Sequence, residues 1–220
     1  MTLDFSEFKN KKIIVTGSST GIGFETGVEF LNLGANVIFH GNKSIADLEA
    51  RIKTKSQSKN FKIFKSDFTN LSQVDNFMNN AINYLNGLDI LVNNAGTMVG
   101  RYQLETISEK DFLKIFDLNA KSAYFATKSA CNIFKKQNYG NIINVSTISA
   151  RTGGSAGSSV YAASKAFVSG ITRSLVSELS PYNIRINAIS PGTINTKFHE
   201  QYSSPEKLEA TRLKIPMKRL

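Results

Sequence analysis

Six short runs of β-branched and aromatic residues alternate with amphipathic stretches along the 220-residue chain. The predicted strands are KIIVTG (12–17), NVIFH (36–40), FKIFK (61–65), LDILVNNAG (88–96), GNIINVST (140–147) and IRINAIS (184–190). Helical patterns lie between them, at about 21–33, 45–55, 71–85, 108–136 and 161–179. Apolar strands that alternate with helices pair in parallel and are covered on both faces. Right-handed crossovers then produce an α/β fold with a doubly wound parallel sheet.

Length and composition predict one domain, residues 1–220, in a cytoplasmic protein. No run approaches the roughly 20 apolar residues of a spanning helix, and the first residues lack an apolar leader segment. The one cysteine, Cys131, suits a reducing compartment and is interpreted as a packed thiol. The net charge of +10 comes from scattered lysines without a nucleic-acid motif, so we expect no nucleic-acid partner, no membrane partner and no metal.

The stretch TGSSTGIG directly follows the first predicted strand and opens the first predicted helix. Glycines allow a sharp turn and a close approach to a pyrophosphate, and a helix N-terminus offers free N–H groups to its charge. The strand-turn-helix context therefore predicts a dinucleotide-binding loop rather than a plain tight turn. The predicted cofactor contacts in this loop are Gly17, Ser18, Ser19, Thr20, Gly21, Ile22 and Gly23.

The end of the second strand bears on the choice between the two nicotinamide cofactors. An acidic residue there bonds the ribose 2′-hydroxyl of NAD and repels a 2′-phosphate. This chain has His40, Asn42 and Lys43 at that point, and no carboxylate. We therefore expect NADP(H), with NAD(H) as the alternative and with Lys43 as either a phosphate ligand or a solvated lysine.

Two further strand ends contribute predicted cofactor contacts. Asp67 is expected to accept from the adenine amino group and Phe68 to line the adenine pocket, whereas Asn70 is expected to cap the next helix. Asn94 and Gly96 end the fourth strand, where small residues admit the ribose and an Asn can tie strand ends together.

These pieces, in this order, resemble the short-chain dehydrogenase/reductase family, whose members have a Rossmann fold. The resemblance covers essentially the whole chain and rests on TGSSTGIG, SDF, NNAG, the Asn of FDLNAKSAYF, INVSTIS, YAASK and INAISPGTINT. By this resemblance Asn119 supports a water chain to Lys165, and Ile194 and Thr196 hold the nicotinamide carboxamide. The order of motifs also selects YAASK over a second Tyr-x-x-x-Lys copy, YFATK, whose Tyr124 and Lys128 are interpreted as helix-surface and packing residues.

The selected pair has a physical rationale. Tyr161 and Lys165 lie four residues apart, which places both on one face of a helix. A phenol with a pKa near 10 needs its anion stabilised to exchange protons at neutral pH. We expect the Lys165 ammonium to lower the pKa of Tyr161 and to bond the nicotinamide ribose, so both residues are predicted to be catalytic and to bind the cofactor.

The hydroxyl that holds the substrate carbonyl is less well defined. The family usually has a serine thirteen positions before the tyrosine, whereas the aligned residue here is Thr147, fourteen before Tyr161. We expect Thr147 to be the catalytic hydroxyl, with Ser146 and Ser149 as alternatives, and all four of these side chains to line the substrate site.

The resemblance leaves several functions open. The leading prediction is a carbonyl reductase or alcohol dehydrogenase resembling 3-oxoacyl-[acyl-carrier-protein] reductase, which acts on an acyl thioester on a carrier protein. In that case Lys135, Lys136 and Arg173 are expected to form a docking patch near the active-site mouth. The alternatives are a sugar or polyol dehydrogenase and a catalytically silent nucleotide-binding protein. Arg101 and His199 are expected to flank the substrate mouth.

Family members continue beyond the point where this chain ends. A helix capped by Ser203 or Ser204, with Pro205 in its first turn, is predicted near the C-terminus. A seventh strand, which family members place after it, is missing, so the chain is expected to be C-terminally incomplete with its sixth strand at the sheet edge. A homo-tetramer or dimer is expected for the full-length protein.

Overall fold

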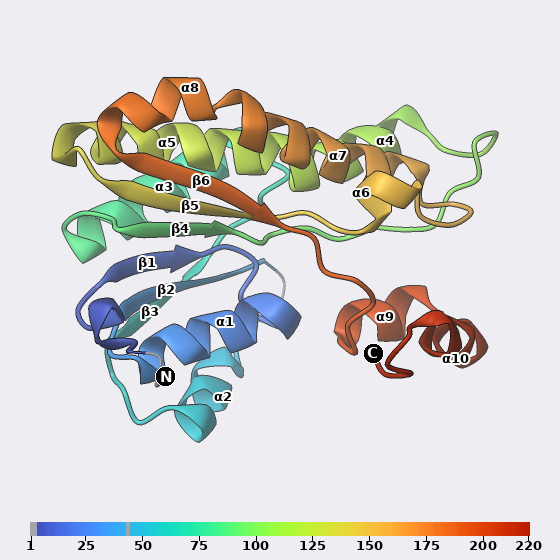
Figure 1. Cartoon of the computed structure of the whole chain (residues 1–220), viewed down its shortest axis with the longest axis horizontal. Coiled ribbons are helices and arrows are strands. Elements are labelled where there is room, and N and C mark those ends of the chain that lie inside the picture. Colours follow the sequence, from blue (N-terminus) through green and yellow to red (C-terminus); the bar gives the residue numbers. More distant parts are fainter. Residues whose placement is uncertain (1–3, 43–44) are drawn as a thin grey trace.

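Six parallel strands form one sheet, in the order β3-β2-β1-β4-β5-β6 (Figure 1). The computed structural model describes residues 4–42 and 45–220. The strands are β1 (Lys12–Val15), β2 (Asn36–Gly41), β3 (Phe61–Lys65), β4 (Ile90–Asn93), β5 (Gly140–Val145) and β6 (Ile184–Ile189). β1, β2 and β4 are buried almost throughout, because helices cover both faces of the sheet. The predicted doubly wound Rossmann fold is therefore confirmed.

Helices form a layer on each face of the sheet (Figure 1). α1 (Gly21–Asn32) and α2 (Leu48–Lys55) cover one face, and α3 (Leu71–Leu85), α5 (Ser122–Gln137) and α7 (Ser159–Ser174) cover the other. One apolar core lies between α1, α2 and the sheet, around Leu31 and Phe39. A second lies between α3, α5 and the sheet, around Met78 and Phe134. These two cores hold the carboxyl ends of the strands in fixed positions.

The helix predicted over 71–85 is confirmed to the residue. Asn70 caps it as expected, because its side chain accepts hydrogen bonds from the Ser72 and Gln73 amides. α1 and β3 also match their predicted ranges closely. α2 begins at Leu48 rather than at 45, because the preceding residues form a turn.

The prediction of one continuous helix over 108–136 is wrong in one respect, because a π-helical segment interrupts it. α4 (Glu109–Phe116) is followed by a π-helical segment (Asp117–Lys121) before α5 begins. The Ser122 amide donates to the Asp117 carbonyl, five residues back, so one extra residue is accommodated in the turn. Such segments are rare and occur mainly at functional sites. Asn119 lies at the centre of this one.

The stretch predicted as one helix over 161–179 forms two. α7 begins at Ser159 and ends at Ser174, and α8 (Val176–Leu179) follows after a break at Leu175. A 3₁₀ turn (Ser180–Tyr182) then leads into β6. Because α7 begins beside the carboxyl end of the sheet, its first turns carry Tyr161 and Lys165 toward that edge.

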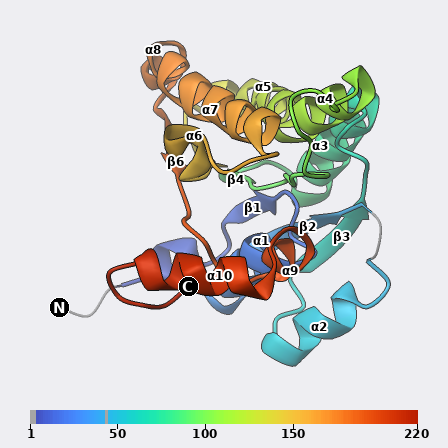
Figure 2. The ribbon, with the colours of Figure 1, turned by 90° about the vertical axis from the view of Figure 1, so that its right-hand side faces the viewer.

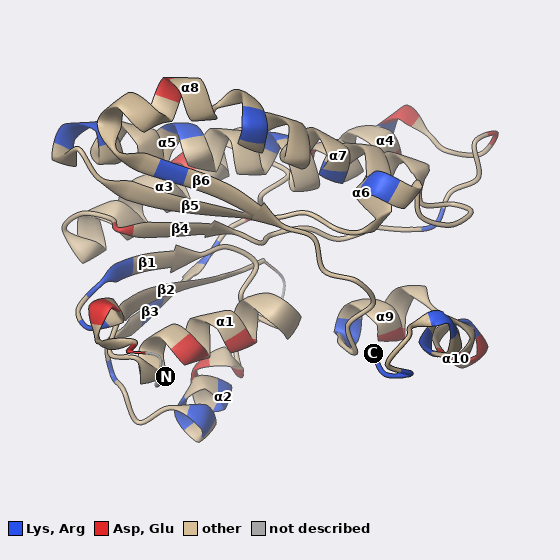
Figure 3. Ribbon diagram, viewed as in Figure 1, with Lys and Arg blue, Asp and Glu red and all other residues tan. Residues whose placement is uncertain are grey.

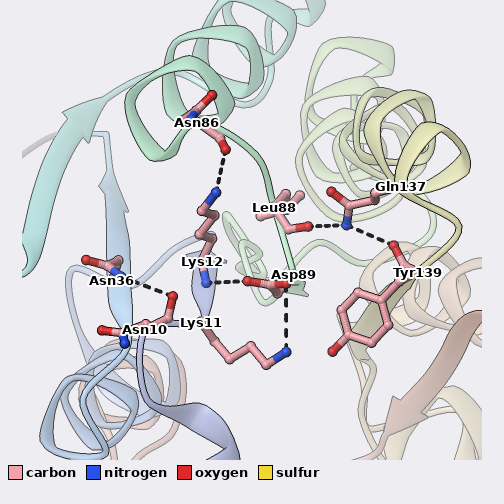
Figure 4. A network of polar contacts seen from close by, with 9 residues as sticks. All are labelled: Asn10, Lys11, Lys12, Asn36, Asn86, Leu88, Asp89, Gln137 and Tyr139. Atoms are coloured by element: carbon pink, nitrogen blue, oxygen red, sulfur yellow. Dashed lines mark hydrogen bonds and ion pairs between the residues drawn. The ribbon is translucent and has the colours of Figure 1, made fainter.

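The amino edge of the sheet is closed by a polar network around Asp89, at the start of β4 (Figure 4). Its carboxylate accepts from the Lys12 amide at 2.7 Å and pairs with the Lys11 ammonium at 3.9 Å. The Gln137 amide ties the Leu88 carbonyl to the end of α5 at 2.6 Å. A short 3₁₀ turn (Ser6–Phe8) precedes β1 at this edge. These contacts pair the polar groups around Asp89, and ligand sites in such sheets lie at the opposite, carboxyl edge.

Two short helices lie beyond the carboxyl ends of the strands, on the α1 side of the sheet (Figures 1 and 2). They are α9 (Lys197–Tyr202), which was not predicted, and α10 (Pro205–Lys214), which was. Ser204 is the cap of α10, since its hydroxyl accepts from the Lys207 amide at 3.3 Å. We call α9 and α10 the lid helices.

β6 is the last strand of the sheet in the part of the chain that the structure describes, as expected. On its uncovered face the side chains of Arg185, Asn187 and Ile189 are exposed.

Lys and Arg residues are spread over many elements rather than collected on one (Figure 3). Among the described residues, none of the helices is both long enough and apolar enough to cross a bilayer.

Candidate active site

The glycine loop, residues 17–23, lies directly against the end of β4. Gly17 and Gly21 have φ values of +62° and +59°, a region that disfavours any residue with a side chain. A Cβ on Gly17 would lie 2.6 Å from the Ala95 Cα, and one on Gly23 would collide with the Asn94 amide. Glycines at these positions therefore let the loop pack tightly and leave its backbone open to the cavity above.

Asn94 holds this loop in place, which matches the prediction that it ties strand ends together. Its Nδ2 donates to the carbonyls of Thr16 and Gly17, both at 2.9 Å. The Thr16 hydroxyl in turn accepts from the Asn94 and Ala95 amides at 3.0 Å. The ends of β1 and β4 are thus joined at the point where the strand order reverses, which is where such folds bind dinucleotides.

The structure corrects two of the predicted cofactor contacts in this region. Ser18 is fully buried, with its hydroxyl donating to the Val15 carbonyl at 2.6 Å and accepting from the His40 amide. His40 is 3% exposed and lies beneath the loop, where its Nδ1 accepts from the Gly17 amide at 2.8 Å. Both side chains support the loop from below, because their polar atoms are already satisfied within the protein.

Phe68 is also corrected, from a pocket-lining ring to a core residue. It is 2% exposed and stacks on the His40 ring at 4.0 Å. Asp67 lies nearer the surface, with Oδ1 accepting from the amide and hydroxyl of Thr69 at 2.9 and 2.8 Å. Hydrogen bonds from Thr69 and Asn42 hold the pKa of Asp67 below its ordinary value, although burial acts to raise it. Lys43 lies outside the described residues.

A buried cluster at the end of β4 contains Lys165 and Asn119. The Lys165 ammonium is 4% exposed and donates to the Val145 carbonyl at 2.8 Å. The Asn119 Nδ2 donates to the carbonyls of Thr97 and Ile115, both at 2.8 Å. Its Oδ1 has no hydrogen-bond partner among the described residues. A Cβ on Gly96 would collide with this oxygen and lie 2.9 Å from the Lys165 Nζ, so only glycine fits between them.

Tyr161 and Lys165 lie one turn apart on α7, on the same side of the helix, as their spacing predicted. Both line the cavity, and the Thr147 side chain is close enough to the Tyr161 hydroxyl to act on its pKa. Thr147 follows β5 directly, and its Oγ1 also accepts from the Ser149 amide at 3.3 Å. The threonine hydroxyl therefore lies beside the phenol, at the carboxyl edge of the sheet.

Ser146 is turned away from this position. Its side chain is 3% exposed, donates to the Lys165 carbonyl at 2.9 Å and lies 2.8 Å from the Ser169 hydroxyl. Its role is to fasten β5 to α7, so the structure corrects its candidacy as a substrate ligand. Ser149 is half-buried and lines the cavity one turn further along.

The predicted lowering of the Tyr161 pKa is wrong for this arrangement. Burial raises the pKa of Tyr161 to about 12, and the hydrogen bond from Thr147 only partly opposes that effect. Burial also lowers the pKa of Lys165 to about 8, and its ammonium is directed at the Val145 carbonyl. Desolvation penalises both charged forms and is the main cause of each shift. The phenol is thus a protonated group throughout the neutral range.

The loop after β6 closes the cavity from the other side. Thr196 lies 3.6 Å from where a Gly21 Cβ would stand, so this loop faces the start of α1. Ile194 is 40% exposed at the cavity wall. The Phe198 ring on α9 lies 5.8 Å from the Tyr161 ring and forms part of the cavity roof. The resulting cavity of about 750 Å³ connects the glycine loop, Tyr161 and the lid helices.

Sequence reasoning missed the contacts that attach the lid. The Tyr202 hydroxyl lies 3.0 Å from the Thr97 hydroxyl, and the Tyr202 carbonyl accepts from the Arg101 Nε at 2.8 Å. The Lys207 ammonium donates to the Ser155 hydroxyl at 2.9 Å. No local sequence signal identifies these pairs, because each joins segments about 50 to 100 residues apart in the chain.

The second Tyr-x-x-x-Lys copy lies on the surface of α5. Tyr124 is 39% exposed on α5 and Lys128 lies over the Phe125 ring, so the second Tyr-x-x-x-Lys copy is a surface and packing element, as expected.

Lys135 and Lys136 lie in the last turn of α5, just before the amino end of β5. They are therefore at the edge opposite the cavity, and the docking patch predicted near its mouth is wrong. Arg173, in the last turn of α7, is likewise far along the helix from Tyr161.

Comparison with known proteins identifies the family. The family model described as short chain dehydrogenase matches residues 11–207. The chain belongs to the short chain dehydrogenase family. It is therefore an oxidoreductase, a short-chain dehydrogenase/reductase, as the motif order indicated.

This short-chain dehydrogenase has curated relatives with different substrates in their names. It is 36% identical over 198 residues to 3alpha-hydroxysteroid dehydrogenase of Mediterraneibacter gnavus, covering 87% of this chain and 77% of that protein. It is 31% identical over 211 residues to 2-dehydro-3-deoxy-D-gluconate 5-dehydrogenase of Escherichia coli, covering 96% and 82%.

Solved structures resemble the short-chain dehydrogenase across most of its length. The DEH reductase A1-R' mutant superposes with a TM-score of 0.88 at 32% identity, covering 99% of this chain and 85% of that one. NADH-dependent reductase A1-R' complexed with NAD gives 0.81 at 33% identity, covering 87% and 82%. The arrangement of sheet and helices is thus shared with these oxidoreductases.

Proposed function

We propose that this protein transfers a hydride between a nicotinamide dinucleotide and a carbonyl or alcohol substrate, with Tyr161 as the proton donor and acceptor. One observation carries the proposal: the phenol and the lysine of α7 share one cavity with the threonine hydroxyl that follows β5 and with an open glycine loop. A silent nucleotide-binding protein would not require Thr147, Tyr161 and Lys165 to line one cavity.

The residues around the glycine loop fit a dinucleotide. Gly17, Thr20, Gly21 and Ile22 line the cavity with backbone that no side chain covers, at the N-terminus of α1. This terminus attracts the negative charge of a pyrophosphate. We propose that this loop, with Ser19, Gly23 and Asn94 as its neighbours, holds the pyrophosphate, and that Gly96 admits the adjoining ribose. Ile194 and Thr196 are proposed to hold the carboxamide.

We further propose NADP(H) as the preferred cofactor. β2 ends at Gly41 and is followed by Asn42, and neither of these two residues carries a carboxylate that would repel a 2′-phosphate. The Arg51 guanidinium lies nearby, since its Nη2 donates to the Ser19 carbonyl at 2.8 Å. A neighbouring structure is complexed with NAD, which keeps NAD(H) as the alternative. Comparing kcat/KM for NADPH and NADH tests this; a clear advantage for NADH would contradict it.

When bound, the dinucleotide supplies or accepts the hydride. In the reductive direction, Tyr161 donates its proton to the carbonyl oxygen, so that one hydride and one proton convert the carbonyl to an alcohol. The Thr147 hydroxyl holds that oxygen where negative charge develops. The raised pKa of Tyr161 keeps the phenol protonated before the reaction, and the Lys165 cation one turn away offsets the charge of the phenolate left behind.

The proton on Tyr161 must then be replaced. The Asn119 Oδ1 and the Lys165 Nζ both border the space beside Gly96. An unpartnered buried oxygen next to an ammonium can hold a proton-carrying water or accept directly from the ammonium. We propose that Asn119 positions this relay, which agrees with the role that the family resemblance implies.

The chain offers its own control for testing this assignment. Tyr161→Phe and Lys165→Met should abolish oxidation of NADPH with a panel of ketones, oxo acids and an acyl thioester. Tyr124→Phe and Lys128→Met alter the second Tyr-x-x-x-Lys copy and should retain activity. Equal loss in both pairs, or full activity of Tyr161→Phe, would contradict the assignment, and cofactor binding without turnover of any substrate would favour a silent protein.

A homo-oligomer is also proposed. An aromatic and apolar patch over α4, α5 and α7 exposes Phe112, Leu113, Tyr124 and Phe167 by 37–47%. Apolar patches of this kind mark protein interfaces. Light scattering after gel filtration would test the proposal, and a monomer at micromolar concentration would contradict it. The cytoplasmic location remains a prediction.

A further inference from the structure

Cationic side chains meet on the cavity wall formed by the lid helices and the loops after β4 and β5. We call Arg101, His199 and Lys207 the cationic cluster; all three line the cavity. Arg101 comes from the loop after β4, His199 from α9 and Lys207 from α10. The fold therefore brings them together from segments about 100 residues apart.

Hydrogen bonds show how closely the cluster is gathered. The Arg101 Nη1 donates to the Ser155 hydroxyl at 3.1 Å and to the Ala156 carbonyl at 3.0 Å. The Lys207 Nζ donates to the same Ser155 hydroxyl at 2.9 Å. Two full positive charges thus share one neutral acceptor. An anion placed between the two charges would be attracted by both of them.

The described part of the chain provides no counter-ion for the cluster. None of the described residues that line the cavity is Asp or Glu. The carboxylate of Glu209 on α10 is paired with Arg212 instead, at 2.6 Å. His199 feels the uncompensated charge, since burial and then the Arg101 and Lys207 cations lower its pKa. Salt bridges to Arg101 or Lys207 are absent from the described ranges, 4–42 and 45–220.

We propose that the substrate carries a carboxylate, which the cationic cluster binds while the reacting carbonyl lies at Tyr161. The inference rests on the proposed function and adds a substrate class to it: small oxo acids and hydroxy acids. Arginine is well suited to this task, because its planar fork matches the two oxygens of a carboxylate.

The segments that carry the cluster and the phenol are in contact, which favours a compact acid. The Phe198 ring, next to His199 in the chain, lies 5.8 Å from the Tyr161 ring. Gly157, four residues before Tyr161, would place a Cβ 3.1 Å from the Arg101 Cβ. Met98 and Phe198 supply an apolar wall along the same cavity. A short carbon chain can therefore lie on this wall with a carboxylate at one end and a carbonyl at the other.

Matched acid and ester pairs test the proposal directly. The probes are 3-oxobutanoate and 4-oxopentanoate with their methyl esters, which keep the carbonyl and remove the charge, together with a broader panel of neutral ketones. We expect kcat/KM to be at least about tenfold higher for the acid in one or both pairs, the effect of one charge-assisted contact. Esters equal to or better than both acids, or turnover of neutral ketones alone, would overturn it.

Variants of Lys207 separate charge from structure. Lys207 is exposed and contacts Ser155 through its ammonium, so Lys207→Gln should lower the acid-to-ester ratio about tenfold, and Lys207→Arg should restore it. Lys128→Gln removes the same charge from the surface of α5 and should leave the ratio unchanged. A ratio that is the same in Lys207→Gln and the unmodified protein would overturn the inference.

Calorimetric binding of 4-oxopentanoate and its methyl ester, with NADPH present, tests the cationic cluster separately from the proposed reaction. Binding of the acid over the ester without turnover would support the cationic cluster and contradict the proposed reaction. Turnover of both with equal affinity would support the reaction and overturn the cluster. Binding and turnover of neither probe, with no activity on the panel, would overturn both.

Discussion

Mild acid should destabilise the fold through His40, and protonation of His40 near pH 4 should loosen the glycine loop. The Gly17 amide donates to the His40 Nδ1 at 2.8 Å, so that nitrogen carries no proton. The proton therefore resides on Nε2, which lies 3.1 Å from the Ser66 carbonyl. A second proton, on Nδ1, would face the Gly17 N–H and break the contact that holds the loop.

The size of the stability loss follows from the shift in the pKa of His40. Burial is the main cause that lowers the pKa of His40 from 6.5 to about 4, and the Ser66 carbonyl and Asp67 oppose it. The unfolded chain thus binds a proton that the folded chain excludes between these two values, so stability is lost as the pH falls through this window. At 1.36 kcal/mol per pKa unit, the loss is about 2 kcal/mol at pH 5 and about 3 kcal/mol below pH 4.

Urea unfolding at pH 7 and pH 5 measures this effect. His40→Gln removes the ring that accepts from the Gly17 amide, so this variant should be less stable than the unmodified protein at pH 7. Because glutamine cannot titrate, its free energy of unfolding should fall by about 2 kcal/mol less on acidification. His199→Gln removes the only other histidine of the chain and should retain most of the pH dependence. Binding of NADPH to the unmodified protein, followed by fluorescence, should weaken only near pH 4, where His40 of the folded protein takes up a proton. Equal acid sensitivity of His40→Gln and the unmodified protein would refute the reasoning.

Three other predictions concern the catalytic cluster. The initial rate of carbonyl reduction should fall as the pH rises through about 8, because Lys165 loses its charge while Tyr161 stays protonated to about 12; a flat rate between pH 7 and 10 would contradict this. Thr147→Ala should lower kcat by about 100-fold, the usual loss of one oxyanion donor, whereas Thr147→Ser should retain most of it, as steady-state kinetics would show. Gly96→Ala would place a methyl group against Asn119 and Lys165, so it should reduce kcat and cost about 1–3 kcal/mol of stability in urea unfolding; a fully active, equally stable variant would refute the packing described.

Much of the architecture was predictable because it follows from short-range patterns. Short apolar runs predict the buried parallel strands and period-3.6 patterns predict the helices, and the Asn70 and Ser204 caps are local hydrogen bonds between residues two or three apart. The two Tyr-x-x-x-Lys copies could also be told apart without a structure, because only Tyr161 follows the strand that carries Thr147.

Positions of individual polar side chains were harder to predict. Ser146 and Thr147 are neighbours with similar hydroxyls, yet one faces α7 and the other faces the cavity, since successive side chains at a strand end point to opposite sides. The π-helical segment at Asn119 inserts one residue without disturbing the apolar pattern, so periodicity does not reveal it.

The sequence by itself therefore determined the doubly wound fold, the glycine loop and the residue types of the catalytic cluster, because these depend on local periodicity and motif order. Only the tertiary structure decided that His40 and Phe68 support the loop from the core, that burial dominates the pKa values of Tyr161 and Lys165, and that lid cations face the cavity. The desolvation of Tyr161 and Lys165, and the close approach of the cations at the cavity, depend on residues far apart in the chain. Both effects therefore exist only in the folded protein.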